Sequence, residues 1–168
     1  FVYQYTQAFF NFKDAAGQPL YDKEGVDWWK NSVEAVKANK QFCNDNIANY
    51  AGQKDLWGLT SGYTSGFSYG VFGAPPAGLA IPSLEVRGAD GTVHPSAVGG
   101  SIPMLPEECI RALNKMKELY DTYGYRVWGD YGFVNSFRMS ANLNETPFPI
   151  ASFYCAIDMG ISLVMAQN

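Results

Sequence analysis

The chain has 168 residues, with 12 basic and 16 acidic side chains and a formal net charge of −4. This length allows one ordinary domain or a large part of a bigger one, and the absence of any Lys or Arg run disfavours a nucleic-acid-binding or polybasic membrane surface. Charged residues make up 17% and aromatic residues 15% of the chain, which excludes disorder and favours a deep core or an aromatic-lined cavity.

The N-terminal part of the chain shows the pattern of two helices joined by a loop. Residues 1–12 place apolar side chains at the spacing of one buried helix face. Residues 14–25 contain glycine and proline, which favours a loop. A second helix is predicted to begin near Asp27, as N-cap or first-turn acid, and to end at about residues 44–46.

Residues 57–101 form a glycine-rich segment that contains more than half of the 17 glycines and also several aromatic residues. A long loop that retains aromatic side chains is typical of a segment that packs and binds something, whereas a linker would be polar. Short strands could occur within it, for example at residues 84–87.

A third helix has the clearest local signals. Pro106 is suited to a first helical turn, the acidic Glu107 and Glu108 suit the positive end of the helix dipole, and Gly124 is suited to follow the last turn. The final helix is predicted from about residue 151 to the end. Asp158 within the apolar stretch 149–166 would cost about 2.5–3.5 kcal/mol in a membrane, so we expect a buried helix there.

Metal, disulfide and nucleotide chemistry find no support in the sequence. The three cysteines are widely spaced and the chain has one histidine, which disfavours a zinc cage or a disulfide framework and favours buried free thiols. The chain also lacks the glycine-rich phosphate-binding motifs, the GxSxG nucleophile elbow and the HExxH zinc motif. We therefore expect neither a metal nor an organic cofactor.

Seven short stretches span the chain in a consistent order: Tyr3-Gln4-Tyr5, Leu56-Trp57-Gly58-Leu59-Thr60, Phe72-Gly73-Ala74-Pro75-Pro76, Asp90-Gly91-Thr92-Val93-His94-Pro95, Pro106-Glu107-Glu108, Val127-Trp128-Gly129-Asp130-Tyr131-Gly132-Phe133-Val134 and Ile157-Asp158-Met159-Gly160. Taken together, they resemble the glucoamylase-like family of carbohydrate-active proteins. That family includes β-1,2-glucanases and the C-terminal domain of cyclic β-1,2-glucan synthases. The resemblance covers the whole chain.

The resemblance implies a mainly α fold, namely about the C-terminal half of an (α/α)6 toroid with long glycine- and aromatic-rich loops that build a sugar-binding cleft. Residues 1–168 would be the C-terminal portion of a single domain, with its N-terminal portion absent from this chain. We therefore expect the chain to associate with that missing half or with another copy, because half a ring leaves apolar helix faces uncovered. No transmembrane segment is expected, and the substrate class implies a periplasmic or extracellular location.

The implied function is glycoside hydrolysis of a glucan or oligosaccharide by general acid/base catalysis. This chemistry needs two carboxyl groups that flank the scissile bond. Asp90 and Asp158 are the candidate catalytic residues. Alternatives remain for both: Asp90 could be a turn aspartate bonded to its own backbone, and Asp158 could tie the last helix to a loop.

Eight further residues are candidates for substrate binding, because aromatic rings can stack on sugar rings and polar side chains can bind hydroxyl groups. For each aromatic residue, core packing is the alternative, and a structural role is open for the histidine. The candidates are Trp57, Tyr69, Phe72, His94, Trp128, Tyr131, Asn135 and Gln7.

Three departures from the family pattern favour a second interpretation. Gln7 and Asn11 stand where the family usually has His and Asp, Gly62 follows Ser61 where it usually has Asp, and Asn135 replaces another Asp. Neutral side chains bind hydroxyls but do not act as acids or bases. The alternative is therefore a non-catalytic glycan-binding relative that has lost family carboxylates.

Overall fold

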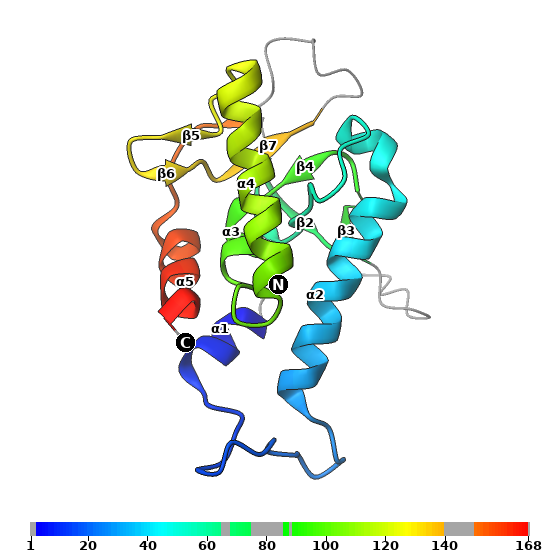
Figure 1. Cartoon of the computed structure of the whole chain (residues 1–168), viewed down its shortest axis with the longest axis vertical. Coiled ribbons are helices and arrows are strands. Elements are labelled where there is room, and N and C mark those ends of the chain that lie inside the picture. Colours follow the sequence, from blue (N-terminus) through cyan, green and yellow to red (C-terminus); the bar gives the residue numbers. More distant parts are fainter. Residues whose placement is uncertain (1–2, 65–67, 75–85, 88, 140–149, 168) are drawn as a thin grey trace.

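The computed structural model describes residues 3–64, 68–74, 86–87, 89–139 and 150–167 (Figure 1). Within these residues the fold is mixed and mostly helical, with short strands between the helices. The helices are α1 (Tyr3–Phe9), α2 (Trp28–Asp45), the 3-10 helix η1 (Ile47–Tyr50), α3 (Pro95–Gly99), α4 (Pro106–Tyr123) and α5 (Ala156–Gln167).

The two longest helices begin where the sequence predicts. Asp27 caps α2, since its Oδ1 accepts a hydrogen bond of 2.9 Å from the backbone nitrogen of Lys30. Helix α4 has Pro106 and two glutamates in its first turn, and Gly124 follows it with φ +68°, a left-handed conformation that glycine adopts without strain.

Three small sheets connect the helices, and their strands are two to four residues long. In the first, β2 (Tyr69–Phe72) pairs antiparallel with β1 (Ser61–Tyr63) and parallel with β3 (Val86–Arg87). In the second, β7 (Ser136–Arg138) lies between β4 (Thr92–Val93) and β8 (Ile150–Ala151). The third is the hairpin of β5 (Trp128–Gly129) and β6 (Gly132–Phe133).

The structure corrects the predicted ends of the outer helices. The last helix begins at Ala156, not at about residue 151, because Ile150 and Ala151 are paired with β7. The first helix ends at Phe9, since the chain then turns into the backbone bridge between Lys13 and Pro19. The expected strand near 84–87 is present as β3, while residues 84 and 85 lie outside the described residues.

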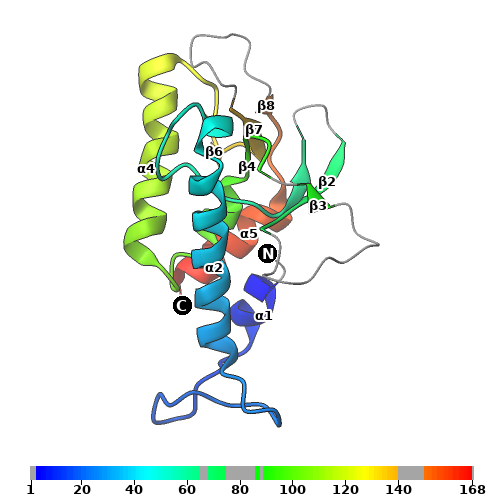
Figure 2. The same ribbon diagram turned by 90° about the vertical axis from the view of Figure 1, so that its right-hand side faces the viewer.

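Helix α3, which the sequence did not predict, lies against both α4 and α5, and α1 contacts α2 and α5 (Figures 1 and 2). Close approach of α3 to α5 depends on Gly99, where an added Cβ would lie 2.9 Å from Ser162 Oγ. The buried core includes Val36, Tyr50, Leu56, Trp57, Leu59, Val93, Val98, Met116, Leu119, Phe137 and Met165.

The three cysteines are free thiols, as predicted, although only two of them are buried. Cys43 and Cys109 lie in the core, and burial raises the pKa of the Cys109 thiol to about 12. Cys155 is half-buried just before α5. Among the described residues, no helix is long and apolar enough to cross a membrane.

Candidate functional site

A pocket of about 300 Å³ lies between α3, α5 and the β5–β6 hairpin, and we call it the α5 pocket. Three residues that the sequence singled out, Trp128, Asn135 and Asp158, lie in its wall. The complete lining of the α5 pocket is Pro95, Ser96, Gly99, Ile102, Leu113, Trp128, Gly132, Phe133, Val134, Asn135, Cys155, Asp158, Met159 and Ser162.

Asn135 and Asp158 form a hydrogen-bonded pair whose orientation is fixed by the backbone. The side-chain oxygen of buried Asn135 accepts a hydrogen bond of 3.1 Å from the backbone nitrogen of Tyr63. Its amide nitrogen must therefore face the other way, and it donates to Asp158 Oδ2 at 2.5 Å. The backbone nitrogen of Asn135 in turn donates to Phe153 at 3.1 Å. One carboxylate oxygen of Asp158 is thus held as an acceptor.

Asp158 lies in the first turn of α5, where the helix dipole favours a negative charge. Tyr5 of α1 is close to this carboxylate: burial, and then the charge of Asp158, raise the pKa of the Tyr5 hydroxyl. Tyr5 therefore stays a neutral hydrogen-bonding group near Asp158 over the ordinary pH range.

The lining of the α5 pocket also contains two aromatic residues, Trp128 and Phe133. Trp128 is 38% exposed, and its ring packs edge-to-face on Phe133 with 4.6 Å between the ring centroids. This contact holds the indole in place at the hairpin. A partly exposed indole in the same lining as a carboxylate and an amide suits a ligand with an apolar face and hydroxyl groups around its edge.

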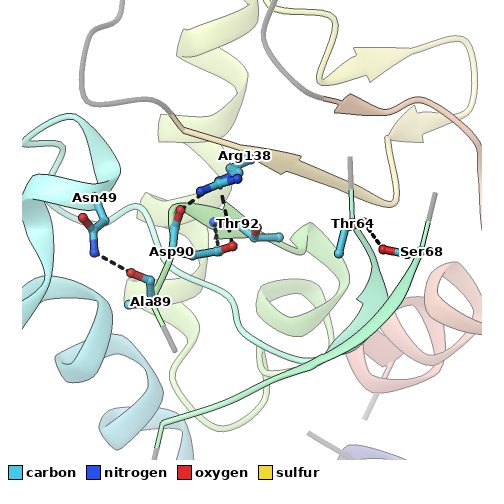
Figure 3. A network of polar contacts seen from close by, with 7 residues as sticks. All are labelled: Asn49, Thr64, Ser68, Ala89, Asp90, Thr92 and Arg138. Atoms are coloured by element: carbon cyan, nitrogen blue, oxygen red, sulfur yellow. Dashed lines mark hydrogen bonds and ion pairs between the residues drawn. The ribbon is translucent and has the colours of Figure 1, made fainter. Parts of the chain in front are cut away.

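Asp90, the other candidate acid, lies in a turn outside the lining of the α5 pocket (Figure 3). Its Oδ1 accepts a 2.9 Å hydrogen bond from the backbone nitrogen of Thr92, and its Oδ2 is 3.8 Å from Arg138 Nε. The Arg138 Nε also donates to the Asp90 carbonyl oxygen at 3.0 Å. The structure thus shows Asp90 bonded to its own turn and to β7.

His94 is fully buried directly before α3, next to Phe72 at 5.2 Å between the rings. Neither ring nitrogen has a hydrogen-bond partner within the described chain. Desolvation lowers the pKa of His94 to about 4, with the charge of Asp90 acting in the opposite sense. A Cβ at Gly62 would lie 2.6 Å from His94 Nε2, so the ring fills the space beside that glycine.

The structure separates the remaining aromatic candidates from the α5 pocket. Trp57 is 1% exposed and Phe72 is also buried, so both rings are enclosed in the core. Tyr69 and Tyr131 are exposed, and they pack edge-to-face on Tyr63 and Tyr154 respectively. None of these four residues belongs to the lining of the α5 pocket.

Gln7 belongs to a second pocket, of about 460 Å³, which shares no lining residue with the first. This pocket lies where α1 ends, and its lining includes Trp29 of α2. We call it the α1 pocket. Its lining is Gln7, Ala8, Phe9, Phe10, Asn11, Phe12, Lys13 and Trp29.

Several residues of the α5 pocket were missed at the sequence level. Ser96, Ser162 and Cys155 lie in its lining because α3 packs on α5, and α3 itself gave only the weak signal of Pro95 at a first helical position. Phe133, also in the lining, did lie within a recognised stretch, although it was not chosen as a site residue. The described residues contain no group of three or more His, Cys, Asp or Glu side chains placed to hold a metal ion.

Comparison with known proteins places these features in context. The curated exo-β-1,2-glucooligosaccharide sophorohydrolase (non-reducing end) of Parabacteroides distasonis is 27% identical over 134 residues, which are 74% of this chain and 17% of that protein. The crystal structure of a putative glucoamylase from Bacteroides fragilis has a TM-score of 0.66 at 25% identity, over 88% of this chain and 30% of that chain.

A third relative has a bound sugar. The endo-β-1,2-glucanase from Chitinophaga pinensis, solved as a sophorotriose and glucose complex, has a TM-score of 0.63 over 98% of this chain and 41% of that one. At 22% identity, this likeness concerns the fold alone. The chain thus spans less than half the length of each of these three relatives. Because residues 1–168, the whole chain, match the Glycoamylase family, described as putative glucoamylase, the chain belongs to that family.

Proposed function

We propose that this chain is part of a glycoside hydrolase that acts on a glucan or oligosaccharide in the α5 pocket, with β-1,2-linked glucose as the first substrate to test. The single observation that supports this is the presence of the oriented Asn135–Asp158 pair and the partly exposed indole of Trp128 in the lining of one pocket. The activity of the Parabacteroides distasonis sophorohydrolase suggests the linkage.

In this proposal Asp158 is the carboxyl group that acts at the sugar. Asn135 occupies Oδ2, which leaves Oδ1 as the oxygen proposed to exchange a proton with the substrate or an attacking water. Trp128 would stack on the apolar face of a sugar ring.

Glycoside hydrolysis needs a second carboxyl group, about 5–5.5 Å from the first to retain configuration or about 6.5–9.5 Å to invert it. Asp158 is the sole carboxyl in the described lining of the α5 pocket. We therefore propose that the second acid comes from the remainder of a longer protein, in which this chain forms about the C-terminal half of an (α/α)6 toroid. A periplasmic or extracellular location fits a polymeric substrate and is proposed on that ground.

The same observation favours a second candidate function, a glycan-binding protein without turnover. A pocket with one carboxylate, one amide and an indole has the groups for binding hydroxyls and a sugar face, and it lacks an acid–base pair among the described residues. The two functions differ in one measurable property, the release of new reducing ends.

The test uses the full-length protein and a panel of glucans that includes β-1,2-glucan. Release of reducing ends is expected, and Asp158→Asn, which keeps an acceptor for Asn135, is expected to lower the rate by about 100-fold or more. Binding of a glucan without turnover at any pH would favour the second function, and no interaction with any glucan would refute both.

Asp90→Asn in the same assay tests the other candidate acid. The variant retains the side-chain oxygen that accepts from Thr92 and loses the charge that faces Arg138. If turnover falls as far as in Asp158→Asn while the melting temperature is unchanged, Asp90 has a chemical role. Unchanged turnover leaves Asp90 with the turn contacts that the structure shows.

A further inference from the structure

Gly129 in β5 has no conformational reason to be a glycine. Its φ lies outside the left-handed region, unlike that of its cross-strand partner Gly132, where φ is +98°. A glycine within a strand costs stability and often marks a place where another group approaches closely. Here that group is Tyr154, because a Cβ at position 129 would overlap with the Tyr154 hydroxyl oxygen. The missing side chain of Gly129 thus makes room for the hydroxyl end of Tyr154.

Tyr154 also contacts the β5–β6 hairpin at a second point. The Tyr131 ring in the turn packs edge-to-face on the Tyr154 ring, with 5.3 Å between the ring centroids. The other end of the hairpin is fixed in the core by the buried Val127 and Val134, which share a backbone hydrogen bond of 3.1 Å. A short two-stranded hairpin is marginally stable by itself, so its outer end depends on contacts such as those of Tyr154.

The place of Tyr154 in the chain connects this hairpin with α5. The next residue, Cys155, belongs to the lining of the α5 pocket, and Asp158 follows in the first turn of the helix. The hairpin contributes Trp128 to the same lining. In Figure 1 the segment that leads into α5 runs beside the hairpin. A change in the contact between Tyr154 and the hairpin would therefore alter the spacing between two elements that both line the pocket.

We propose that Tyr154 is a positioning residue of the α5 pocket. Its hydroxyl end, seated beside Gly129, fixes how far the hairpin stands from α5, so that the indole of the hairpin and the carboxylate of α5 contact one ligand together. Tyr154 is itself outside the lining, so it acts through the hairpin and not by touching the ligand. The positioning role rests on the contacts of Tyr154, whereas the ligand, a glucosyl unit, rests on the proposed function.

The test adds a methyl group at position 129 and then removes the oxygen that it meets. Gly129→Ala should displace the hairpin, because the new Cβ and the Tyr154 hydroxyl overlap. Tyr154→Phe in the same chain removes that oxygen and leaves ring carbon Cζ 3.6 Å from the new Cβ, an ordinary contact distance. The double variant should therefore regain the wild-type arrangement. Gly160→Ala is the matched control, since its added Cβ on α5 would have nothing within 4 Å.

The readout is the fluorine resonance of Trp128 in the full-length protein labelled with 5-fluorotryptophan and assigned through single tryptophan-to-phenylalanine variants. Without ligand, this resonance should move in Gly129→Ala and return in the double variant, while the core residue Trp57 keeps its resonance. A sophorose analogue with sulfur as the bridging atom, which is not hydrolysed, should bind about three- to tenfold more weakly to Gly129→Ala. The double variant and the Gly160→Ala control should bind it within about twofold of the wild type.

A Trp128 resonance that stays in place in Gly129→Ala, or that does not return in the double variant, overturns the positioning role. An unchanged affinity for the analogue together with a lower melting temperature overturns it as well, because Tyr154 would then only stabilise the fold. If Gly129→Ala loses the Trp57 resonance and so does not fold, Tyr154→Ala replaces it. That variant removes atoms without creating an overlap, and it should likewise move Trp128 and weaken binding; an unmoved Trp128 overturns the proposal.

The results separate this inference from the proposed function. If the analogue does not bind to the wild type and no glucan is cleaved, the proposed function fails, and the resonances recorded without ligand still decide whether Tyr154 positions the hairpin. If glucan is cleaved and the Trp128 resonance does not respond to Gly129→Ala, the hydrolase stands and the positioning role fails.

Discussion

The Asn135 side chain joins the backbone nitrogen of Tyr63 in β1 to the carboxylate of Asp158 in α5, so replacing either end of its amide removes one hydrogen bond. Asn135→Asp keeps the acceptor for Tyr63 and places a second carboxylate against Asp158. At neutral pH the unfolding free energy should fall by about 1–3 kcal/mol, because the donor is lost and two like charges meet.

This loss should shrink in mildly acidic solution. Two adjacent carboxylates raise the pKa of one of them above its unfolded value, so the shared proton stabilises the folded variant at low pH and is lost as the pH rises. Urea denaturation at several pH values measures the effect. Asn114→Asp, at an exposed position on α4, is the control and should stay within about 0.5 kcal/mol of the wild type throughout. Equal losses in both variants would contradict the pairing.

His94 predicts a second pH dependence, of the opposite sign. Its pKa is about 4 in the fold and 6.5 for the free side chain, since burial disfavours the charged ring. Between these values the unfolded chain binds more protons, so the unfolding free energy should rise by about 3 kcal/mol as the pH increases from 4 to 6.5. His94→Leu should remove this component. Parallel pH curves for the two proteins would show that the ring is not buried as described.

At the scale of elements, the start of α2 depends on one side chain. Asp27→Ala removes the acceptor for the Lys30 backbone nitrogen and should lower the unfolding free energy by about 1 kcal/mol. Asp27→Asn keeps an acceptor at the same place and should retain most of the stability. Thermal melts followed by far-ultraviolet circular dichroism compare the three proteins. If Asp27→Asn lost as much stability as Asp27→Ala, the charge of Asp27 and not its capping hydrogen bond would stabilise the start of α2.

The elements that the sequence predicted best are those with their own local signals. Helix α2 has a capping aspartate, and helix α4 has a first-turn proline and a following glycine. The bounds of both helices match the prediction closely. The two-residue strands depend on partners far along the chain, as in the pairing of Ala151 with Ser136, and no local pattern announces them. Helix α5 begins later than predicted for the same reason.

The candidate site also combines residues that the sequence could predict with features that depend on packing between distant segments. Sequence reasoning selected Trp128, Asn135 and Asp158 individually, and the structure places all three in one lining. It also selected Trp57, Phe72 and His94, which are enclosed in the core. Residue type and motif do not tell a buried ring from an exposed one, because that difference is set by packing between distant segments. The contribution of α3 to the pocket depends on such packing too.

At the scale of the whole molecule, several large apolar side chains face outward on the helices that flank the core. Ile157 and Leu163 on α5 are each 67% exposed, and Phe9 at the end of α1 is 71% exposed. Exposed apolar surface of this kind marks a contact with another protein surface. We propose that it meets the remainder of the same domain in a longer protein, or a second copy when the 168 residues stand alone.

The isolated chain should therefore sediment as a species larger than 18.5 kDa. Leu163→Glu should shift it toward the monomer, since a charge on this face opposes apolar contact. Glu118→Leu, a reciprocal change on exposed α4, should not have this effect. A wild-type chain that sediments as a monomer and melts cooperatively would count against the proposed contact of these apolar side chains with another protein surface.

The His94 ring packs directly against Gly62, and this contact limits which segments of this fold can be replaced by those of a relative. Position 62 belongs to β1 and position 94 precedes α3, yet any β-carbon at 62 would come within 2.6 Å of the imidazole. Grafting a segment with a larger residue at position 62 onto this backbone would therefore need a smaller residue at 94 in the same step. In a recombination library, these two segments should be inherited together or not at all.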